Sequence, residues 1–241
     1  MSTSAHDEYN NHTATGSINS LFFQIFVVQH PLRARMCGFG EKDRRTIDPP
    51  PAVQLKFFNQ NWEPVELTEA EVSSMIVSAS LWSQDGLQPC SLVVDPSSIP
   101  ASSATCTDKG IRVLSLGEPK KINNLIGTTV SSSFFLLDHN NESGVFFIFN
   151  DLSIRTEGRF RLRFTFVNIE SIDVNSKVLA EITSNVFGVY SAKKFPGMTP
   201  STPLSKAFSE QGIRIPIRTR SYVKNKTKTD LDENANDEPG L

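Results

Sequence analysis

The stretch from Arg159 to Val167, RFRLRFTFV, constrains the fold more than any other part of this sequence. Arginine or threonine alternates in it with phenylalanine or leucine. A period of two predicts a β-strand, because successive side chains of a strand point to opposite faces of the sheet. The aromatic face is expected to be buried, with Arg159, Arg161 and Arg163 on the other face. Such an arginine row is typical of protection against aggregation, and DNA contact is the alternative interpretation.

Several other segments have the composition of short strands. They are LFFQIFVVQ from Leu21, AVQLKFF from Ala52, MIVSASLW from Met75, GVFFIF from Gly144, KVLAEI from Lys177 and NVFGVYS from Asn185, and IRIPIRT from Ile213 alternates as well. Short strands with turn residues between them predict an all-β fold, an antiparallel β-sandwich with one or two peripheral helices.

Two helical segments are indicated by their capping residues. Thr68 and Glu71 form a capping-box pattern, which predicts a short helical turn before the strand at Met75. Near the end, Thr202 can cap a helix, Pro203 suits its first position, and Gly212 can end it. The second helix is therefore expected over LSKAFSEQ.

Composition divides the chain into one domain with two tails. Residues 1–19 are polar and lack periodicity, so we expect a disordered N-terminal tail, followed by a domain over 20–221. Within the domain, the Ser/Pro-rich stretch at about 95–124 is predicted to be a flexible, irregular insertion. Residues 222–241, a basic patch and then an acidic run, are predicted to be a disordered C-terminal tail.

Bulk properties exclude several classes of function. The net charge is −2, so any nucleic-acid partner must be recognised by a local basic patch. Three widely spaced cysteines argue against disulfides and a zinc site and favour a reducing compartment. The apolar runs are too short for a membrane helix, and the start does not resemble a secretory signal. Hydrolase, metalloprotease and nucleotide-binding motifs are missing, so we expect no catalytic, metal or cofactor site.

Two segments are nonetheless locally basic. The first, HPLRARMCGFGEKDRRTIDPPP, ends in three prolines and carries Arg33, Arg35, Lys42, Arg44 and Arg45. The second, from Lys206 to Lys228, holds seven cations against Glu210 alone. Arginines in a loop at one end of a β-sandwich suit contacts to DNA phosphates or guanine edges. The alternative is ordinary surface charge, paired with neighbours such as Glu41 and Asp43.

The sequence also resembles the fungal velvet-domain regulators. The resemblance covers about Leu21 to Arg220 and rests on RARMCGFGEKDRRTIDPPPAVQL, GTTVSSSFFLLD, GVFFIFNDLSIRTEGRFRLRFTFVNIE and SNVFGVYSAKKFPGMTPSTPLSKAFSEQGIRIPIR. The compact length is similar to that of the spore-viability type and its small relatives. The resemblance implies an immunoglobulin-like β-sandwich related to Rel-homology domains and no catalytic activity.

For function, the resemblance implies a nuclear DNA-binding regulator of sporulation, development and secondary metabolism, with shuttling from the cytoplasm left open. It implies homo- or heterodimers with other velvet proteins, and double-stranded DNA as a partner. The basic loop maps the DNA contact onto Arg33, Arg35, Lys42, Arg44 and Arg45. The alternative hypothesis is a dimerisation module that works through another velvet protein with little direct DNA contact.

Overall fold

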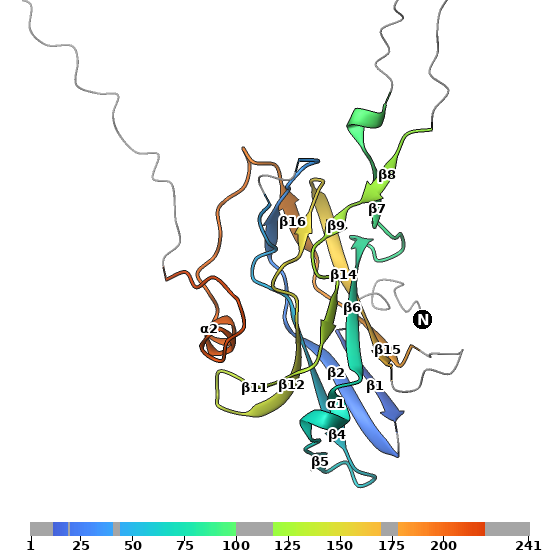
Figure 1. Ribbon diagram of the computed structural model, residues 1–241, viewed down its shortest axis with the longest axis vertical. Coiled ribbons are helices and arrows are strands. Elements are labelled where there is room, and N and C mark those ends of the chain that lie inside the picture. The colour runs from blue at the N-terminus through green and yellow to red at the C-terminus, as the bar shows by residue number, and fades with distance from the viewer. Residues whose placement is uncertain (1–11, 19, 41–43, 100–117, 170–177, 220–241) are drawn as a thin grey trace, which may run out of the picture.

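Two β-sheets pack face to face in the computed structural model, which describes residues 12–18, 20–40, 44–99, 118–169 and 178–219 (Figure 1). The first sheet contains, in spatial order, β1 (Thr13–Ile18), β2 (Leu21–Gln29), β4 (Ala52–Phe58), β12 (Ser143–Ile148) and β11 (Phe134–Leu137), and β5 (Pro64–Val65) pairs with β4. The second contains β10 (Val130–Ser132), β6 (Met75–Ser83), β14 (Gly158–Asn168), β16 (Phe187–Tyr190) and β3 (Arg33–Arg35), and β15 (Ala180–Thr183) pairs with β14. The predicted all-β sandwich is confirmed.

Smaller elements complete the described part of the chain. Two short ladders pair β13 (Ser153–Ile154) with β9 (Leu125–Ile126), and β7 (Leu92–Val94) with β8 (Lys121–Asn123). The helices are α1 (Glu69–Val72), α2 (Pro203–Glu210) and the single 3-10 turn η1 (Pro96–Ser98). None of the helices in the described ranges has the length and apolar composition needed to cross a bilayer.

The strand β14 behaves as its alternating sequence predicts. Phe160, Leu162, Phe164 and Phe166 are all buried in the core between the sheets. Phe166 contacts Phe23 of β2 edge to face, with ring centroids 5.3 Å apart. Ten of the chain's seventeen phenylalanines are buried, so aromatic side chains supply much of the apolar area that stabilises the sandwich.

The arginines on the outer face of β14 are more than a solvated row. The Arg161 guanidinium donates hydrogen bonds to the carbonyl oxygens of Gln84, at 2.8 Å, and Ser184, at 3.0 Å. Arg163 lies 3.4 Å from the centre of the Trp82 ring, a cation–π contact. Arg159, at the beginning of the row, is exposed. Two of the three arginines therefore bind parts of the second sheet and its loops together.

A second, smaller apolar cluster lies on the outer face of the first sheet. Phe146 and Ile148 of β12 point away from the main core and pack under α2, where Phe208 contacts Phe146 with ring centroids 4.9 Å apart. This two-sided burial explains the unbroken apolar run VFFIF in β12. As predicted, the Thr202 hydroxyl caps α2 by accepting a hydrogen bond from the Ser205 amide, and Pro203 occupies the first turn.

Three predictions need correction: two segments expected to be irregular contain ordered elements, and one alternating segment forms no strand. Thr13–Ile18, assigned to a disordered tail, forms the edge strand β1, which needs only backbone hydrogen bonds to β2 and so carries no apolar signal. Gly16 permits this pairing, since a Cβ atom there would lie 2.4 Å from the Phe23 ring. Residues 1–11, 19 and 222–241 of the two predicted tails lie outside the described residues.

The predicted flexible insertion at 95–124 is ordered at both ends. η1 follows its start and β8 pairs with β7 near its end, while 100–117 lie outside the described residues. Conversely, the alternating IRIPIRT from Ile213 forms no strand. Its Ile215 packs into the cluster under α2, so the alternation there reflects contact with a helix and a sheet face.

Candidate nucleic-acid interface

The first half of the basic segment is an edge strand of the second sheet, not a loop. β3 runs parallel to β16, with Arg33 opposite Gly188 and Arg35 opposite Tyr190. Ala34, between the two arginines, is fully buried, so Arg33 and Arg35 both project from the outer face. Both side chains are half-buried, and Arg33 Nη1 lies 3.5 Å from the Gly197 carbonyl oxygen.

The sheet register brings a third arginine to the same face. Gly188 of β16 is opposite Arg159 of β14 on one side and opposite Arg33 of β3 on the other. Residues in register project to the same side of a sheet, so Arg159 and Arg33 lie two strand spacings apart, about 10 Å. The Tyr190 ring lies over Gly188, where a Cβ atom would come within 2.9 Å of it. Glycine at 188 thus leaves room for an aromatic ring between two arginines.

Beyond β3 the chain is held by backbone hydrogen bonds as far as its glycines. The amide of Met36 donates to Tyr190 O at 2.8 Å, and the amide of Gly38 donates to Arg155 O at 3.1 Å. Gly38 has a φ of +64°, a left-handed conformation that glycine adopts without strain. Arg155 Nη1 donates back to Gly38 O at 3.0 Å. The turn at Gly38, which we call the glycine turn, is therefore anchored to the residues between β13 and β14.

Arg44 has a structural partner. Its Nη2 atom lies 2.9 Å from Asp151 Oδ1 and also donates to the Asp151 carbonyl oxygen, while Nε lies 3.4 Å from Ser153 Oγ. The interpretation of paired surface charge therefore holds for this residue, although the partner is distant in sequence and is not Glu41 or Asp43. Arg45 is exposed, and Lys42 lies outside the described residues.

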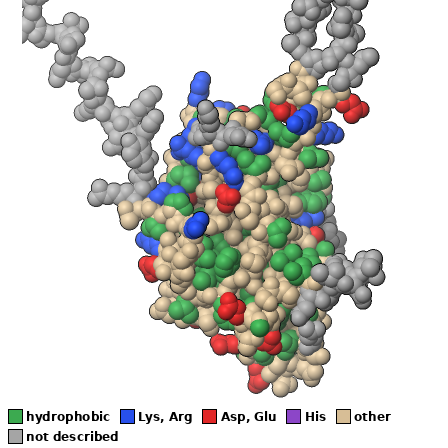
Figure 2. Space-filling model, in the orientation of Figure 1, with side chains coloured by type: hydrophobic (Ala, Val, Ile, Leu, Met, Phe, Trp, Pro, Cys, Tyr) green, Lys and Arg blue, Asp and Glu red, His purple; other side chains and the backbone are tan. Residues whose placement is uncertain are grey.

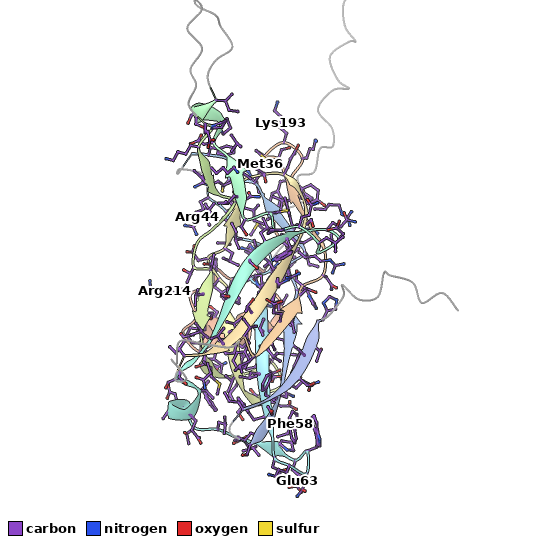
Figure 3. All side chains as sticks on the ribbon, turned by 90° about the vertical axis from the view of Figure 1, so that its right-hand side faces the viewer. Met36, Arg44, Phe58, Glu63, Lys193 and Arg214 are labelled. Atoms are coloured by element: carbon purple, nitrogen blue, oxygen red, sulfur yellow. The ribbon has the colours of Figure 1, made fainter. Side chains whose placement is uncertain are left out.

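Two lysines that sequence reasoning missed lie beside the basic strand. Lys193 and Lys194 are exposed in the turn that follows β16, whose parallel pairing with β3 places both strand ends together. Figure 3 shows Lys193 and Met36 at the same end of the sandwich. The only signal of this lysine turn in the sequence is the pair of lysines that directly follows a predicted strand, in VYSAKK.

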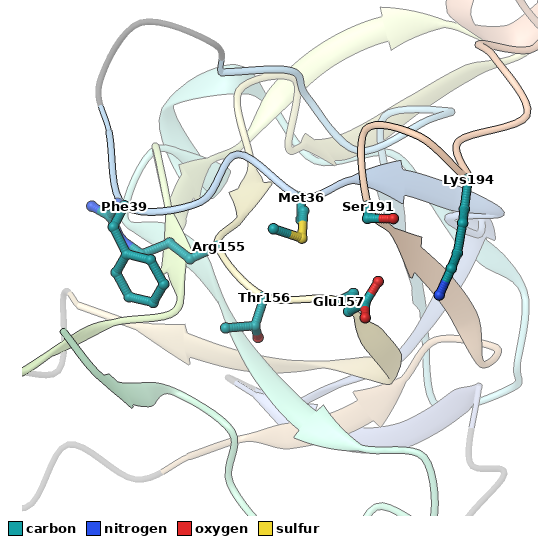
Figure 4. Close-up of a pocket in the computed structure, with 7 residues that line it drawn as sticks. All are labelled: Met36, Phe39, Arg155, Thr156, Glu157, Ser191 and Lys194. Carbon is teal, nitrogen blue, oxygen red and sulfur yellow. The ribbon is translucent and has the colours of Figure 1, made fainter. Parts of the chain in front are cut away.

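A shallow hollow of about 350 Å³ separates the lysine turn from the glycine turn. Met36 and Thr156 line its middle, and Lys194 lies on the side opposite Phe39 and Arg155 (Figure 4). Glu157 also lines the hollow and adds a negative charge to it. The hollow is open and mixed in polarity, and within the described ranges no group of three or more His, Cys, Asp or Glu side chains could hold a metal ion.

Cations gather at this end of the molecule. We call Arg33, Arg35, Arg159, Lys193 and Lys194 the basic face. Figure 2 shows most of the blue side chains toward the end of the sandwich near β16, with a few red ones among them, and mainly red side chains at the opposite end. From the second basic segment, Lys206 and Arg214 are exposed, whereas Arg218 is bound to the buried Asp48. The basic face is therefore the strongest candidate for contact with a polyanion.

The fold and its charge describe a class, an all-β sandwich with cations gathered at one end. Comparison with known proteins specifies the class further: a family model described as "Velvet factor" matches residues 23–221. The chain therefore belongs to the velvet family.

Named relatives agree with this assignment. The chain is 33% identical to "Velvet complex subunit 2" of Gibberella moniliformis, over 84% of this chain and 62% of that protein. It is 30% identical to the protein of the same name from Hypocrea jecorina, over 84% of this chain and 64% of that protein. It is 37% identical to "Spore development regulator vosA" of Beauveria bassiana, over 80% of this chain and 65% of that protein. The chain thus spans somewhat less than two thirds of the length of these relatives.

Proposed function

We propose that this protein is a DNA-binding transcriptional regulator of fungal development that acts in the nucleus as a homo- or heterodimer with another velvet protein. Sporulation and secondary metabolism are the processes it would control, and it would have no catalytic role. The observation that carries the proposal is the β14–β16–β3 register, which gathers Arg159, Arg33 and Arg35 on one face beside the lysine turn. The names of its relatives, which include a spore development regulator, support the developmental role.

The chemistry of the basic face suits a DNA backbone. Guanidinium groups bind phosphate oxygens with two parallel hydrogen bonds, and ammonium groups add charge without fixed geometry. Strands hold Arg33, Arg35 and Arg159 at fixed spacings, so the face is pre-organised. Arg44 would contribute little, because Asp151 already neutralises it.

Salt-dependent affinity for duplex DNA tests this proposal. We would compare the full chain with a variant in which Arg33, Arg159 and Lys193 are changed to glutamine. Each phosphate contact contributes about 0.9 to the slope of log affinity against log salt, so the slope should fall by about 2 to 3 units. The matched control changes the exposed cations Lys56, Lys206 and Arg214 to glutamine and should leave the slope unchanged.

A second function, a dimerisation module with little direct DNA contact, draws support from two observations. Several relatives are named as subunits of a velvet complex, and Arg44, one of the predicted contacts, is already paired. If the folded wild-type chain has no affinity for duplex DNA, direct recognition by this chain alone is refuted. The partner-dependent module is then favoured, and DNA binding should be regained only with a second velvet protein present.

A further inference from the structure

Asp48, the residue before the three prolines, joins two distant segments of the chain. Its side chain is almost completely buried, with 1% exposed, and its Oδ1 atom accepts a hydrogen bond from Arg218 Nη2. Its Oδ2 atom accepts hydrogen bonds from the Thr199 amide, at 2.6 Å, and from the Thr199 hydroxyl, at 2.7 Å. One carboxylate therefore holds a residue that precedes α2 and a residue that follows it.

The two ends of this segment are also bound to each other. The amide of Ser201 donates to Arg218 O at 2.9 Å, and Arg218 Nε donates to Thr199 O at 3.1 Å. We call residues 199–218 the α2 arm. Asp48 thus closes a polar network at the base of the arm, where both of its ends meet the domain.

The α2 arm covers an apolar face and a strand edge. Leu204, Phe208 and Ile215 pack on Ala52, Phe146 and Ile148 in the smaller of the two apolar clusters, apart from the core between the sheets. At the far end of the arm, the Gln211 side chain accepts from the Leu137 amide at 2.7 Å and donates to Leu137 O at 2.8 Å. These bonds occupy the outer edge of β11. Release of the arm would expose both surfaces.

The residue at the base of the arm lies in a sequence that kinases recognise. Thr199 precedes Pro200 in the stretch Ser191 to Thr202, which has no helix or strand, and Pro200 is exposed. Thr199 itself is half-buried, so its hydroxyl is reached once the segment opens locally. Segments held by small clusters open at low free energy compared with a main core.

We propose that Thr199 is a phosphorylation site for a proline-directed serine/threonine kinase, and that its phosphate releases the α2 arm. The kinase transfers the γ-phosphoryl group of ATP to Thr199 Oγ1, which loses its proton to the kinase. The bond to the β–γ bridging oxygen breaks, and ADP leaves. The hydroxyl donor facing Asp48 is replaced by a group carrying about −1.5 to −2 charges.

Repulsion then opens the base of the arm. A phosphate and a buried carboxylate cannot share the site, because like charges in contact destabilise each other strongly where water is excluded. Arg218 carries a single positive charge and cannot neutralise both. Thr202 also precedes a proline, but its hydroxyl faces the neutral Gln29 amide and the α2 N-terminus, where a phosphate is tolerated. The release mechanism is therefore specific to Thr199.

Phosphorylation of the full chain tests the site. The chain and a synthetic peptide of residues 194–206 are each incubated with a purified proline-directed kinase and ATP, and the sites are located by fragmentation mass spectrometry. We expect phosphate at Thr199 in both. A peptide modified at Thr199 beside a full chain that is not, or modification of Thr202 alone in both, would overturn the assignment.

Variants test the release by hydrogen exchange at the amides of Leu204–Glu210. Thr199→Glu should accelerate exchange there by about 100-fold, and β14 should be unchanged. Thr199→Val, which removes the hydroxyl without adding charge, should accelerate exchange only a few-fold. Thr199→Glu should have little effect when Asp48 is already changed to asparagine. The double variant Asp48→Asn, Thr199→Glu should therefore exchange at nearly the same rate as Asp48→Asn alone. Equal effects of the Glu and Val variants, or much faster exchange in the double variant than in Asp48→Asn alone, would refute release by charge repulsion.

Discussion

The two ends of the sandwich differ in charge and in how their charged side chains are held. At one end lie the basic face and the glycine turn, and at the other Glu63, Glu66, Glu69 and Glu71 surround β5 and α1 (Figures 2 and 3). At the acidic end, Asn59 Nδ2 donates to Glu63 at 2.7 Å, and Glu71 accepts from Thr68 in a capping box. Glu63 and Glu71 are therefore bound within their own turns, whereas Glu66 accepts a hydrogen bond from Ser143 Oγ of β12, at 3.1 Å.

The cations at the basic end are placed by sheet register instead. Arg33 and Arg159 are 126 positions apart in the chain (159 − 33) and share a face only because both are opposite Gly188. Glu63 and Glu71 are hydrogen-bonded within a few residues of their own positions, whereas Arg159, Lys193 and Lys194 at the basic end are exposed. We therefore infer that the basic end is the binding end and that the acidic end is a structural cap.

The largest loss of stability is expected from a substitution in the core that the two ends share. Phe166→Ala removes an aromatic ring that contacts Phe23 and Phe147, and should lower the free energy of unfolding by about 3–5 kcal/mol. Trp62 and Trp82 allow each region to be followed by fluorescence in single-tryptophan variants. Coincident transitions are expected, and separate midpoints for the two tryptophans would contradict a shared core. Val167→Ala, on the outer side of the same strand, is the control and should cost far less.

His30, the first residue of the basic segment, should make the free energy of unfolding depend on pH between about 4 and 6.5. Burial, and then the charge of His12, lower the pKa of His30 to about 4. The unfolded chain binds a proton at this residue below pH 6.5 and the folded chain does not, so stability falls as the pH falls through this window. Because His30 is partly exposed and water screens its charge, we expect the free energy of unfolding to fall by about 1–2 kcal/mol across this window. His30→Gln should flatten this part of a curve of unfolding free energy against pH. An unchanged slope would contradict the assignment.

Single substitutions should separate binding from structure within the basic end. Arg44→Ala breaks the contacts to Asp151 and should lower the free energy of unfolding by about 1 kcal/mol, while leaving the salt slope of DNA binding unchanged. Arg33→Ala should do the reverse, lowering the slope by about 0.9 with little effect on stability. Isothermal DNA titrations at several salt concentrations and urea unfolding measure both quantities. If Arg44→Ala also lowers the salt slope, Arg44 must leave Asp151 and contact a phosphate when DNA binds, which would contradict its structural role.

Local patterns in the sequence predicted the parts of the fold that depend on local physics. The alternation in β14 and the Thr202–Pro203 helix start are both readable, because strand pleat and helix capping act over a few residues. Edge strand β1 was missed, since backbone pairing imposes little on its side chains.

The candidate site was only partly predictable for the same reason. Local charge was enough to pick out Arg33 and Arg35 as candidates, but Arg159 lies beside them only through the sheet register. Arg44 drops out of the candidate site because it is paired with Asp151, which is distant in sequence. The role of Asp48 is likewise invisible in the sequence, because its partners follow it by more than 150 residues. Register and long-range pairing are decided by the packing of whole sheets.

The smallest effect is expected at the acidic end, in the capping box of α1. Hydrogen bonds from the Thr68 amide and hydroxyl lower the pKa of Glu71 below its usual 4.5, so its stabilisation is present above pH 4.5 and is lost as the pH falls through the lowered pKa. Glu71→Gln should therefore lower the Tm slightly at neutral pH, and the difference from wild type should vanish in acid. Glu69→Gln removes the same charge from the same turn but leaves the capping box intact, so its Tm should change less. If both variants behave alike, the carboxylates at this end act only through the helix dipole, and the contrast with the basic end would rest on charge alone.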